Sequence, residues 1–272
     1  MKKIIYDLGS GNGENIPYYL LKSDLVVAVE AIPIFCEEIT IKFNKEILEK
    51  KLIVENFIIT TDKGNLDKEF FIHKNKNILS QFPIPKPELR DHFIKTKLPS
   101  KNLIEIIKKH GNPYYIKIDT ENYDYEILSE LFINNIFPEY LSVECYDNEI
   151  FEKIINNENY NSYKLVCGAN VHTKYNNRML SLENKKIKYS FPLHSAGPFG
   201  NDIDGKWLAK KNFKFLFSFA NTTWIDIHCS KVDLPNKYYL PIDLMLYFNK
   251  KILKKFLILI LIIIFIIIIK FL

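Results

Sequence analysis

The sequence predicts an α/β protein organised around a mostly parallel β-sheet. From residue 3 to residue 59, apolar runs suited to buried strands alternate with segments of helical spacing, as in β-α-β units. A glycine-rich turn at residues 9–13 joins the first strand to the first helix, and Glu30, Asp119 and Glu144 close later strands. Because parallel strands present their carboxyl ends at one edge of an open sheet, we expect a ligand crevice there.

The first half of the sheet follows in order along the chain. Its expected strands are residues 3–8, 25–29 and 52–59. One helix is expected to run through Leu21, and a second over residues 35–50, where the preceding Pro33 suits a helix start. The order strand, helix, strand, helix, strand predicts parallel pairing between the three strands.

The second half is expected to add two parallel strands and an antiparallel edge hairpin. Residues 75–99 are proline-rich and are predicted to form a long loop of the kind used as a lid. Ser100 is the expected N-cap of the next helix, and residues 163–167 and 178–182 are expected to pair as the edge hairpin. The other expected elements are strands at 70–72, 114–118 and 140–143, with helices at 100–110 and 123–134.

The chain is expected to divide into a sheet domain at residues 1–182, an accessory segment at 183–231, a linker at 232–251 and a hydrophobic tail at 252–272. The tail holds 18 apolar residues and three lysines. Its uninterrupted apolar run of 14 residues would be about 21 Å long as a helix, against roughly 30 Å for a bilayer core. If its lysines reach the membrane interfaces, the whole tail is long enough to span a bilayer, so it is a candidate membrane anchor. The alternatives are a buried helix, a buried strand and a low-complexity tract.

Composition excludes several classes of protein. The 37 basic and 32 acidic residues give a net charge of only +5, and Arg90 and Arg178 are the only arginines, so no nucleic-acid partner is expected. The four cysteines are far apart and form no C-x-x-C pair, which predicts free thiols rather than a zinc site or disulfides. Because Asp7 and the glycines interrupt the first apolar stretch, no signal peptide is predicted and a cytoplasmic location is expected.

Three segments resemble a known family. Residues 6–13, YDLGSGNG, resemble motif I of class I S-adenosylmethionine-dependent methyltransferases, and residues 29–33, VEAIP, resemble their second motif. Residues 116–128, IKIDTENYDYEIL, are similar to the K-I-D-x-E-G-x-E/D-x-x-x-L signature of the FkbM family, with Asn122 in place of glycine. Asparagine tolerates positive φ better than most residues, so the turn is expected to survive.

The resemblance spans about residues 3–182. It implies a Rossmann-like class I methyltransferase sheet, S-adenosylmethionine as cofactor, and O-methylation of a hydroxyl on a sugar, a glycan or a related small molecule. The residues it assigns to the methionine end of the cofactor are Asp7, Gly9, Gly11 and Gly13. Glu30 is expected to accept hydrogen bonds from the ribose hydroxyls, and Asn56 is either a group beside the adenine or a turn residue.

The same resemblance places Asp119 and Glu121 beside the sulfonium and the acceptor. A sugar hydroxyl is a poor nucleophile, so a general base is expected to help, with Asp119 the first choice and Glu121 the second. The alternative role for either residue is to cap the following helix. His194 is a further candidate base, or a loop hydrogen-bonder, in a turn-rich stretch at residues 191–202 expected to fold over the site and help select the acceptor. Glu144 is expected to line the acceptor pocket, to bind a divalent cation with Asp119, or to bond loop amides, and no metal is assigned.

Three other functions are weighed against methyl transfer. A nicotinamide-dependent dehydrogenase is disfavoured because the glycines follow D-x-G-x-G-x-G rather than G-x-G-x-x-G. A noncatalytic, membrane-tethered binding module with the same fold remains open. Methylation of nucleobases is disfavoured because the D/N-P-P-Y/F loop of those enzymes is replaced by residues 119–122, DTEN. The oligomeric state is not predicted.

Overall fold

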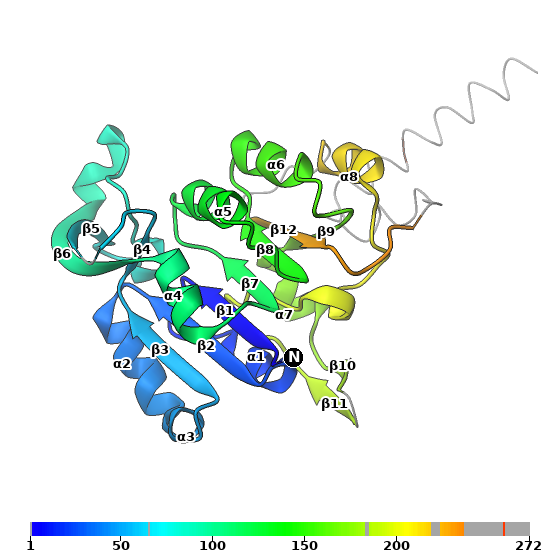
Figure 1. Cartoon of the computed structure of the whole chain (residues 1–272), viewed down its shortest axis with the longest axis horizontal. Coiled ribbons are helices and arrows are strands. Elements are labelled where there is room, and N and C mark those ends of the chain that lie inside the picture. The colour runs from blue at the N-terminus through cyan, green and yellow to red at the C-terminus, as the bar shows by residue number, and fades with distance from the viewer. Residues whose placement is uncertain (1, 65, 183–184, 219–223, 237–257, 259–272) are drawn as a thin grey trace, which may run out of the picture.

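The computed structural model describes residues 2–64, 66–182, 185–218, 224–236 and Ile258. Its centre is a seven-stranded sheet in the order β3-β2-β1-β7-β8-β12-β9 (Figure 1). The strands are β1 Ile4–Leu8, β2 Leu25–Glu30, β3 Leu52–Asn56, β7 Tyr115–Ile118, β8 Tyr140–Glu144, β9 Ser162–Cys167 and β12 Ile225–Ser230. The first five pair in parallel, while β12 runs antiparallel to both β8 and β9. The mostly parallel α/β sheet predicted from the sequence is confirmed.

The strand order reverses direction at β1, which pairs with β2 on one side and with β7 on the other. This reversal is a topological switch point, where connections leave toward opposite faces and open a crevice at the carboxyl ends of the strands. The glycine turn follows β1, and Asp119 follows β7. The fold therefore brings these two segments together from positions over 100 residues apart.

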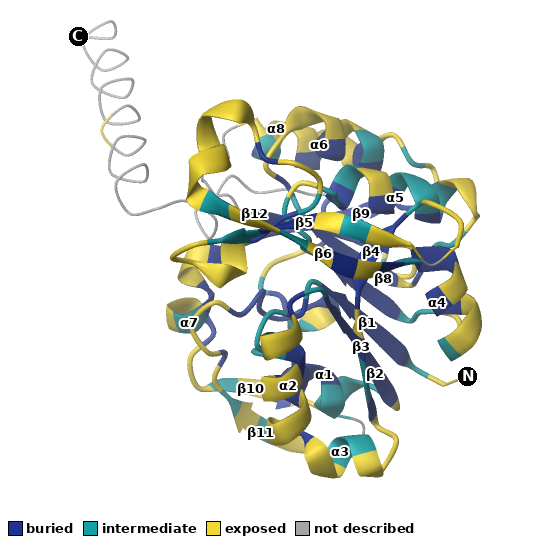
Figure 2. Ribbon diagram, turned by 90° about the vertical axis from the view of Figure 1, so that its left-hand side faces the viewer, coloured by how far each residue is buried: buried dark blue, intermediate teal, exposed yellow. Residues whose placement is uncertain are grey.

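Helices cover both faces of the sheet (Figures 1 and 2). One face packs α4 Leu103–His110, α5 Asp124–Ile133, α6 Asn148–Ile155 and α8 Lys210–Phe217. The other packs α1 Ile16–Lys22, α2 Pro33–Lys42 and α7 Val171–Lys174, while the short α3 Asn44–Leu48 follows α2. Pro33 is the first residue of α2, as expected. The expected helix over 35–50 is two helices, because Phe43 leaves the helical conformation with φ −115° and ψ 28°.

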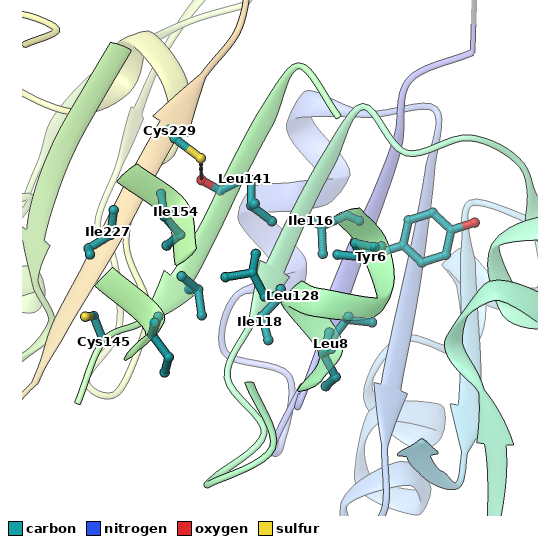
Figure 3. Close-up of a cluster of buried hydrophobic side chains, with 14 of the residues drawn as sticks. Tyr6, Leu8, Ile116, Ile118, Leu128, Leu141, Cys145, Ile154, Ile227 and Cys229 are labelled. Carbon is teal, nitrogen blue, oxygen red and sulfur yellow. Dashed lines mark hydrogen bonds between the residues drawn. The ribbon is translucent and has the colours of Figure 1, made fainter. Parts of the chain in front are cut away.

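The core under α4, α5 and α6 is built from alternate residues of neighbouring strands (Figure 3). Leu8, Ile118 and Val143 point to this face and are at most 1% exposed. The residues between them point to the opposite face, as the two-residue period of a strand requires. Burial of this apolar layer at roughly 25 cal/mol per Å² is the main force that holds the sheet against its helices.

A second, three-stranded sheet stands at the crevice end and corrects three predictions. Its strands are β4 Ile58–Thr60, β5 Asp67–His73 and β6 Phe93–Asn102, in the order β4-β6-β5. Residues 75–99 are therefore not a loop: they hold two short 3₁₀ helices, Asn77–Leu79 and Pro87–His92, and most of β6. The expected strand at 52–59 is split between the two sheets. The cap of α4 is Asn102, whose side chain accepts from Ile104 N at 2.8 Å, and not Ser100, which lies within β6.

The expected edge hairpin is wrong. β9 pairs with β12, and β10 Arg178–Ser181 pairs with β11 Lys186–Tyr189 in a separate two-stranded sheet. The segment 183–231, expected to be accessory, thus supplies an inner strand of the central sheet. The predicted linker at 232–251 and tail at 252–272 lie almost wholly outside the described residues. Within the described part of the chain, no helix combines the length and apolar character needed to cross a membrane.

Gly9 sits where the two switch-point segments touch. A Cβ atom there would lie 1.7 Å from the carbonyl oxygen of Asp119, and Gly9 has φ +75°. Gly9 N donates to Val29 O and Asp119 N donates to Leu8 O, at 3.0 and 3.1 Å, so neither segment is free to withdraw. Only glycine fits both the space and the backbone conformation.

We expect Gly9→Ala to lower the free energy of unfolding by at least about 3 kcal/mol, because a methyl group would force the two segments apart. Gly64→Ala is the matched control: Gly64 has φ +89° but open space around its Cβ position, so only the backbone cost of about 1–2 kcal/mol is expected. Urea unfolding followed by circular dichroism measures both. Equal losses would contradict the close approach at Gly9.

Candidate functional site

A cavity of about 420 Å³ opens at the switch point, between the ends of β1, β2 and β7 and the second sheet. Six of the residues singled out in the sequence line it, together with Glu144: Gly9, Gly11, Glu30, Asp119, Glu121 and His194. Asp7, Gly13 and Asn56 do not line the cavity. The structure therefore brings together the predicted ribose acid, two glycines and all the predicted catalytic residues.

The second sheet and its connections, together with the start of α2, give the cavity an apolar wall that the sequence reasoning missed. Its members are Ile32, Phe35, Phe57, Ile58, Ile59, Phe70 and Phe82. The Phe82 ring meets Tyr123 edge-on, with ring centroids 4.9 Å apart, which links this wall to the start of α5. Aromatic and aliphatic side chains on one side of a cavity suit a planar, apolar ligand group. The usable signal was the cluster of phenylalanines between residues 57 and 82.

Glu30 holds the base of the cavity through its backbone contacts. Its Oε2 accepts from Gly11 N and its Oε1 accepts from Ile32 N, each at 2.8 Å. Burial raises the pKa of Glu30 to about 7, against the lowering effect of these backbone bonds. Asn56 donates to Glu30 O at 2.9 Å and Ala31 O at 3.0 Å, so its side chain fixes the turn after β2 and does not face the cavity.

The glycines of the turn have different tasks. Gly11 has φ +54° and carries the N–H that meets Glu30, so it orients the acid at the edge of the cavity. Gly13 has φ +84°, and a Cβ there would lie 3.0 Å from both Ile16 and Ile39. Gly13 therefore allows α1 and α2 to pack closely behind the turn, away from the cavity.

Lys117 lies beneath the cavity and is 4% exposed. Its ammonium group lies 3.0 Å from Asp119 Oδ2 and 3.6 Å from Asp7 Oδ1, and donates to Gly9 O at 3.0 Å. Burial alone would lower the pKa of Lys117, but Asp119 and Asp7 offset this, so its pKa stands above the usual value. Asp7 is fully buried, and burial raises its pKa to about 6. Asp7 thus acts as a buried charge partner of Lys117.

Asp119, Glu121 and Glu144 meet in one part of the cavity lining. One oxygen from each lies within 4.8 Å of the others. Burial and, next, the charge of Asp119 raise the pKa of Glu121 to about 8 and that of Glu144 to about 10. Three carboxyl groups crowded in a half-buried space are held against their mutual repulsion by the sheet and the turn that carry them.

The turn at residues 119–122 explains this arrangement. Glu121 has φ 53° and Asn122 has φ 73°, so the asparagine at the glycine position adopts the left-handed conformation, as expected. Asp124 Oδ1 accepts from both the N and the Oγ1 of Thr120 at 2.8 Å and closes the turn. The N-cap of α5 is Tyr123, with no side-chain cap hydrogen bond, so neither Asp119 nor Glu121 serves as a helix cap.

The stretch 191–202 lies over the glycine turn. Asn15 Oδ1 accepts from both Ser195 Oγ and Ala196 N at 2.9 Å, which ties the stretch to the residue before α1. The Phe199 ring stacks on Tyr115 at 4.0 Å between centroids. His194, with φ 65°, is exposed and lines the cavity. Of the residues in this stretch, His194 is the one in the cavity lining, so a role of the stretch in acceptor selection stays a prediction.

Comparisons with known proteins find neighbours in fold. No protein-family model matches the sequence, and no curated protein matches it. The chain is similar to the structure of an uncharacterized protein from Listeria monocytogenes serotype 4b, with 10% identity over 89% of this chain and 66% of that chain, just under two thirds, at a TM-score of 0.39.

Two further neighbours are methyltransferases. TrmK of M. capricolum, solved with S-adenosyl-homocysteine, is 9% identical over 89% of this chain and 67% of that chain, with a TM-score of 0.38. An S-adenosylmethionine-dependent O-methyltransferase from Thermotoga maritima is 9% identical over 87% of this chain and 62% of that chain, with a TM-score of 0.35. At such identities the likeness concerns the Rossmann-like fold alone.

We expect the stability of the protein to fall relative to a Glu30→Gln variant as the pH rises. The folded-state pKa of Glu30 is about 7, above its usual 4.5, so the folded state retains a proton that the unfolded state has lost. The proton on Glu30 therefore stabilises the folded state fully below about pH 4.5, and this contribution is lost as the pH rises through about 7. The difference in the free energy of unfolding between the unmodified protein and the Glu30→Gln variant should change by up to about 3 kcal/mol over this range.

Urea unfolding at pH 5 and pH 9 measures this difference, with Glu37→Gln as control, since Glu37 is exposed on α2. A pH-independent difference between the Glu30→Gln variant and the unmodified protein would contradict the raised pKa of Glu30.

Proposed function

We propose that this chain is an S-adenosylmethionine-dependent methyltransferase of the FkbM type, which O-methylates a hydroxyl of a sugar, a glycan or a related small molecule. The observation that supports it most is the division of one cavity into an apolar wall, a ribose-type acid on a glycine turn, and a carboxylate end. These features match, in order, an adenine, a ribose and a reaction centre with an alcohol acceptor. The FkbM-like segment 116–128 supplies Lys117, Asp119 and Glu121 of that last part.

The cofactor would lie along the switch-point edge. Glu30 has two carboxylate oxygens, each with a lone pair beyond the backbone N–H it already accepts, so it is suited to two ribose hydroxyls. Phe35, Phe57 and Ile58 would pack against the adenine. Gly9 and Gly11 let the backbone approach the methionine part without Cβ interference, while Lys117 and Asp7 hold the turn from below.

The cofactor supplies a methyl group on a cationic sulfur, whose S–CH₃ bond breaks as the O–CH₃ bond forms and whose bonding pair stays on sulfur. The protein has to align the acceptor oxygen, exclude water and remove the hydroxyl proton. Asp119, Glu121 and His194 line the cavity and are the proposed candidates for accepting this proton. The 191–202 stretch, tied to Asn15, would close the acceptor side; the segment 183–231 thus contributes to acceptor binding.

We expect the full chain to bind S-adenosylmethionine in isothermal titration calorimetry. Glu30→Gln should weaken binding about 10–100-fold, because charge-assisted hydrogen bonds to ribose hydroxyls contribute about 1.5–3 kcal/mol. Glu37→Gln, on the exposed face of α2, should bind as the unmodified protein does. No binding by the folded unmodified protein would overturn the proposed function.

Methyl transfer is measured with S-adenosylmethionine labelled on its methyl group and a panel of mono- and oligosaccharides. We expect Glu121→Gln to lower turnover by at least about 100-fold, because Glu121 is one of the carboxyl groups at the proposed reaction centre, with cofactor affinity unchanged. Glu158→Gln, an exposed position, is the control. Cofactor binding without transfer to any hydroxyl compound would favour a noncatalytic binding module instead.

A further inference from the structure

Asp119, Glu121 and Glu144 are placed as ligands around one point. Asp119 and Glu121 come from the turn after β7, and Glu144 ends β8, the neighbouring parallel strand. One oxygen from each falls within 4.8 Å of the others. Oxygens on opposite sides of a bound Mg²⁺ or Ca²⁺ are roughly 4–5 Å apart, so the three fit within a single coordination sphere.

A fourth carboxylate, that of Asp226, lies next to Glu144 in the sheet. Asp226 on β12 is the direct cross-strand partner of Glu144, so both side chains project from the same face of the sheet. Cys145 N donates to Ile225 O, which makes Glu144 and Asp226 a non-hydrogen-bonded pair, the class in which opposed side chains lie closest. Asp226 is 3% exposed, and its buried Oδ1 has no hydrogen-bond partner among the described residues.

The charge around these carboxylates is not balanced by the protein. Lys117 is the only lysine or arginine among the described residues that line the cavity. Its ammonium group is engaged with Asp119 Oδ2, Asp7 and the carbonyl of Gly9. Within the described ranges, no ion pair reaches Glu121, Glu144 or Asp226. A bound cation would let these carboxylates ionise without leaving their charge unbalanced.

We infer that Asp119, Glu121 and Glu144 bind one hard divalent cation, such as Mg²⁺, Mn²⁺ or Ca²⁺, at the proposed acceptor end of the cavity, with Asp226 adding negative charge beside Glu144. All donors are carboxylate oxygens, and no thiol or imidazole belongs to the set, which selects against zinc and copper. Three protein ligands leave positions open for water or an acceptor oxygen, as such ions prefer.

The role of the ion in catalysis rests on the proposed function. An acceptor hydroxyl bound to the ion would be aligned for attack and would lose its proton more easily, because the ion stabilises the alkoxide. Asp119 and Glu121 then serve as ligands, and the proton passes to His194, which lines the same cavity and is not part of the carboxylate group.

The test is titration of Mn²⁺ into the metal-free full chain without cofactor, followed by electron paramagnetic resonance of the free ion. We expect one saturable site per chain. Glu144→Gln should weaken binding at least tenfold, and Asp226→Asn, which alters no ligand, about tenfold. Glu158→Gln, which changes one exposed carboxylate elsewhere, should bind as the unmodified protein does. Mn²⁺ should also raise the Tm of the unmodified protein but not that of the Glu144→Gln variant.

Absence of a saturable site, or binding that Glu144→Gln and Asp226→Asn leave unchanged, would overturn the inference. If Glu144→Gln fails to fold by circular dichroism, Asp226→Asn decides alone. Calorimetry with S-adenosylmethionine on the same samples separates the two proposals. Cofactor binding without Mn²⁺ binding removes only the cation site, whereas Mn²⁺ binding without cofactor binding removes only the proposed function.

Discussion

The buried ammonium group of Lys117 connects the two strands between which the cavity opens. It reaches Asp7 on β1, the carbonyl of Gly9 after β1, and Asp119 after β7. A lone ammonium or carboxylate in this position would be strongly unfavourable, because neither would be solvated. The contacts between Lys117 and the two carboxylates keep all three charged groups in place. They also fix the position of the glycine turn relative to the Asp119 turn. The close contact between Gly9 and Asp119, which leaves no room for a Cβ atom at Gly9, depends on this relative position.

Lys117 belongs to a polar row that crosses the sheet. Asp7, Lys117, Ser142, His228 and Lys164 are successive cross-strand neighbours on β1, β7, β8, β12 and β9. All five are buried, on the face covered by α1, α7 and the 191–207 region. Burial and, next, the charge of Lys164 lower the pKa of His228 to about 3, so His228 is neutral, and burial lowers the pKa of Lys164 to about 8. The row therefore has an uncharged centre at Ser142 and His228 between Lys117 and Lys164.

The strands differ in how far the sequence alone could predict them, and the buried polar residues of β12 account for one strand that it could not predict. β1, β2 and β7 are apolar runs ended by a glycine turn or an acid, and they were identified because the signal is local. β12 was missed because Asp226, His228 and Ser230 alternate with its apolar residues, a pattern that normally indicates a solvent-exposed edge. In the folded chain these polar groups are buried under the 191–207 region, a condition set by distant segments. β6 was not predicted either, because it follows a proline-rich stretch that is typical of a loop. Its pairing with β5 depends on an irregular connection that gives no local sequence signal.

The two halves of the candidate site differ in the same way. The proposed cofactor half uses Gly9, Gly11 and Glu30, which lie within 22 residues of one another and form a unit whose geometry is set by β1, β2 and one turn. The acceptor half draws on the Asp119 turn, the end of β8, the second sheet and the 191–202 stretch, which meet only in the tertiary structure. Changes in the second sheet or in the 191–202 stretch would leave the Lys117 contacts under the glycine turn in place, since those contacts are with Asp7, Gly9 and Asp119. Substitutions in these two segments are therefore expected to change the proposed acceptor side and to leave the proposed cofactor side as it is.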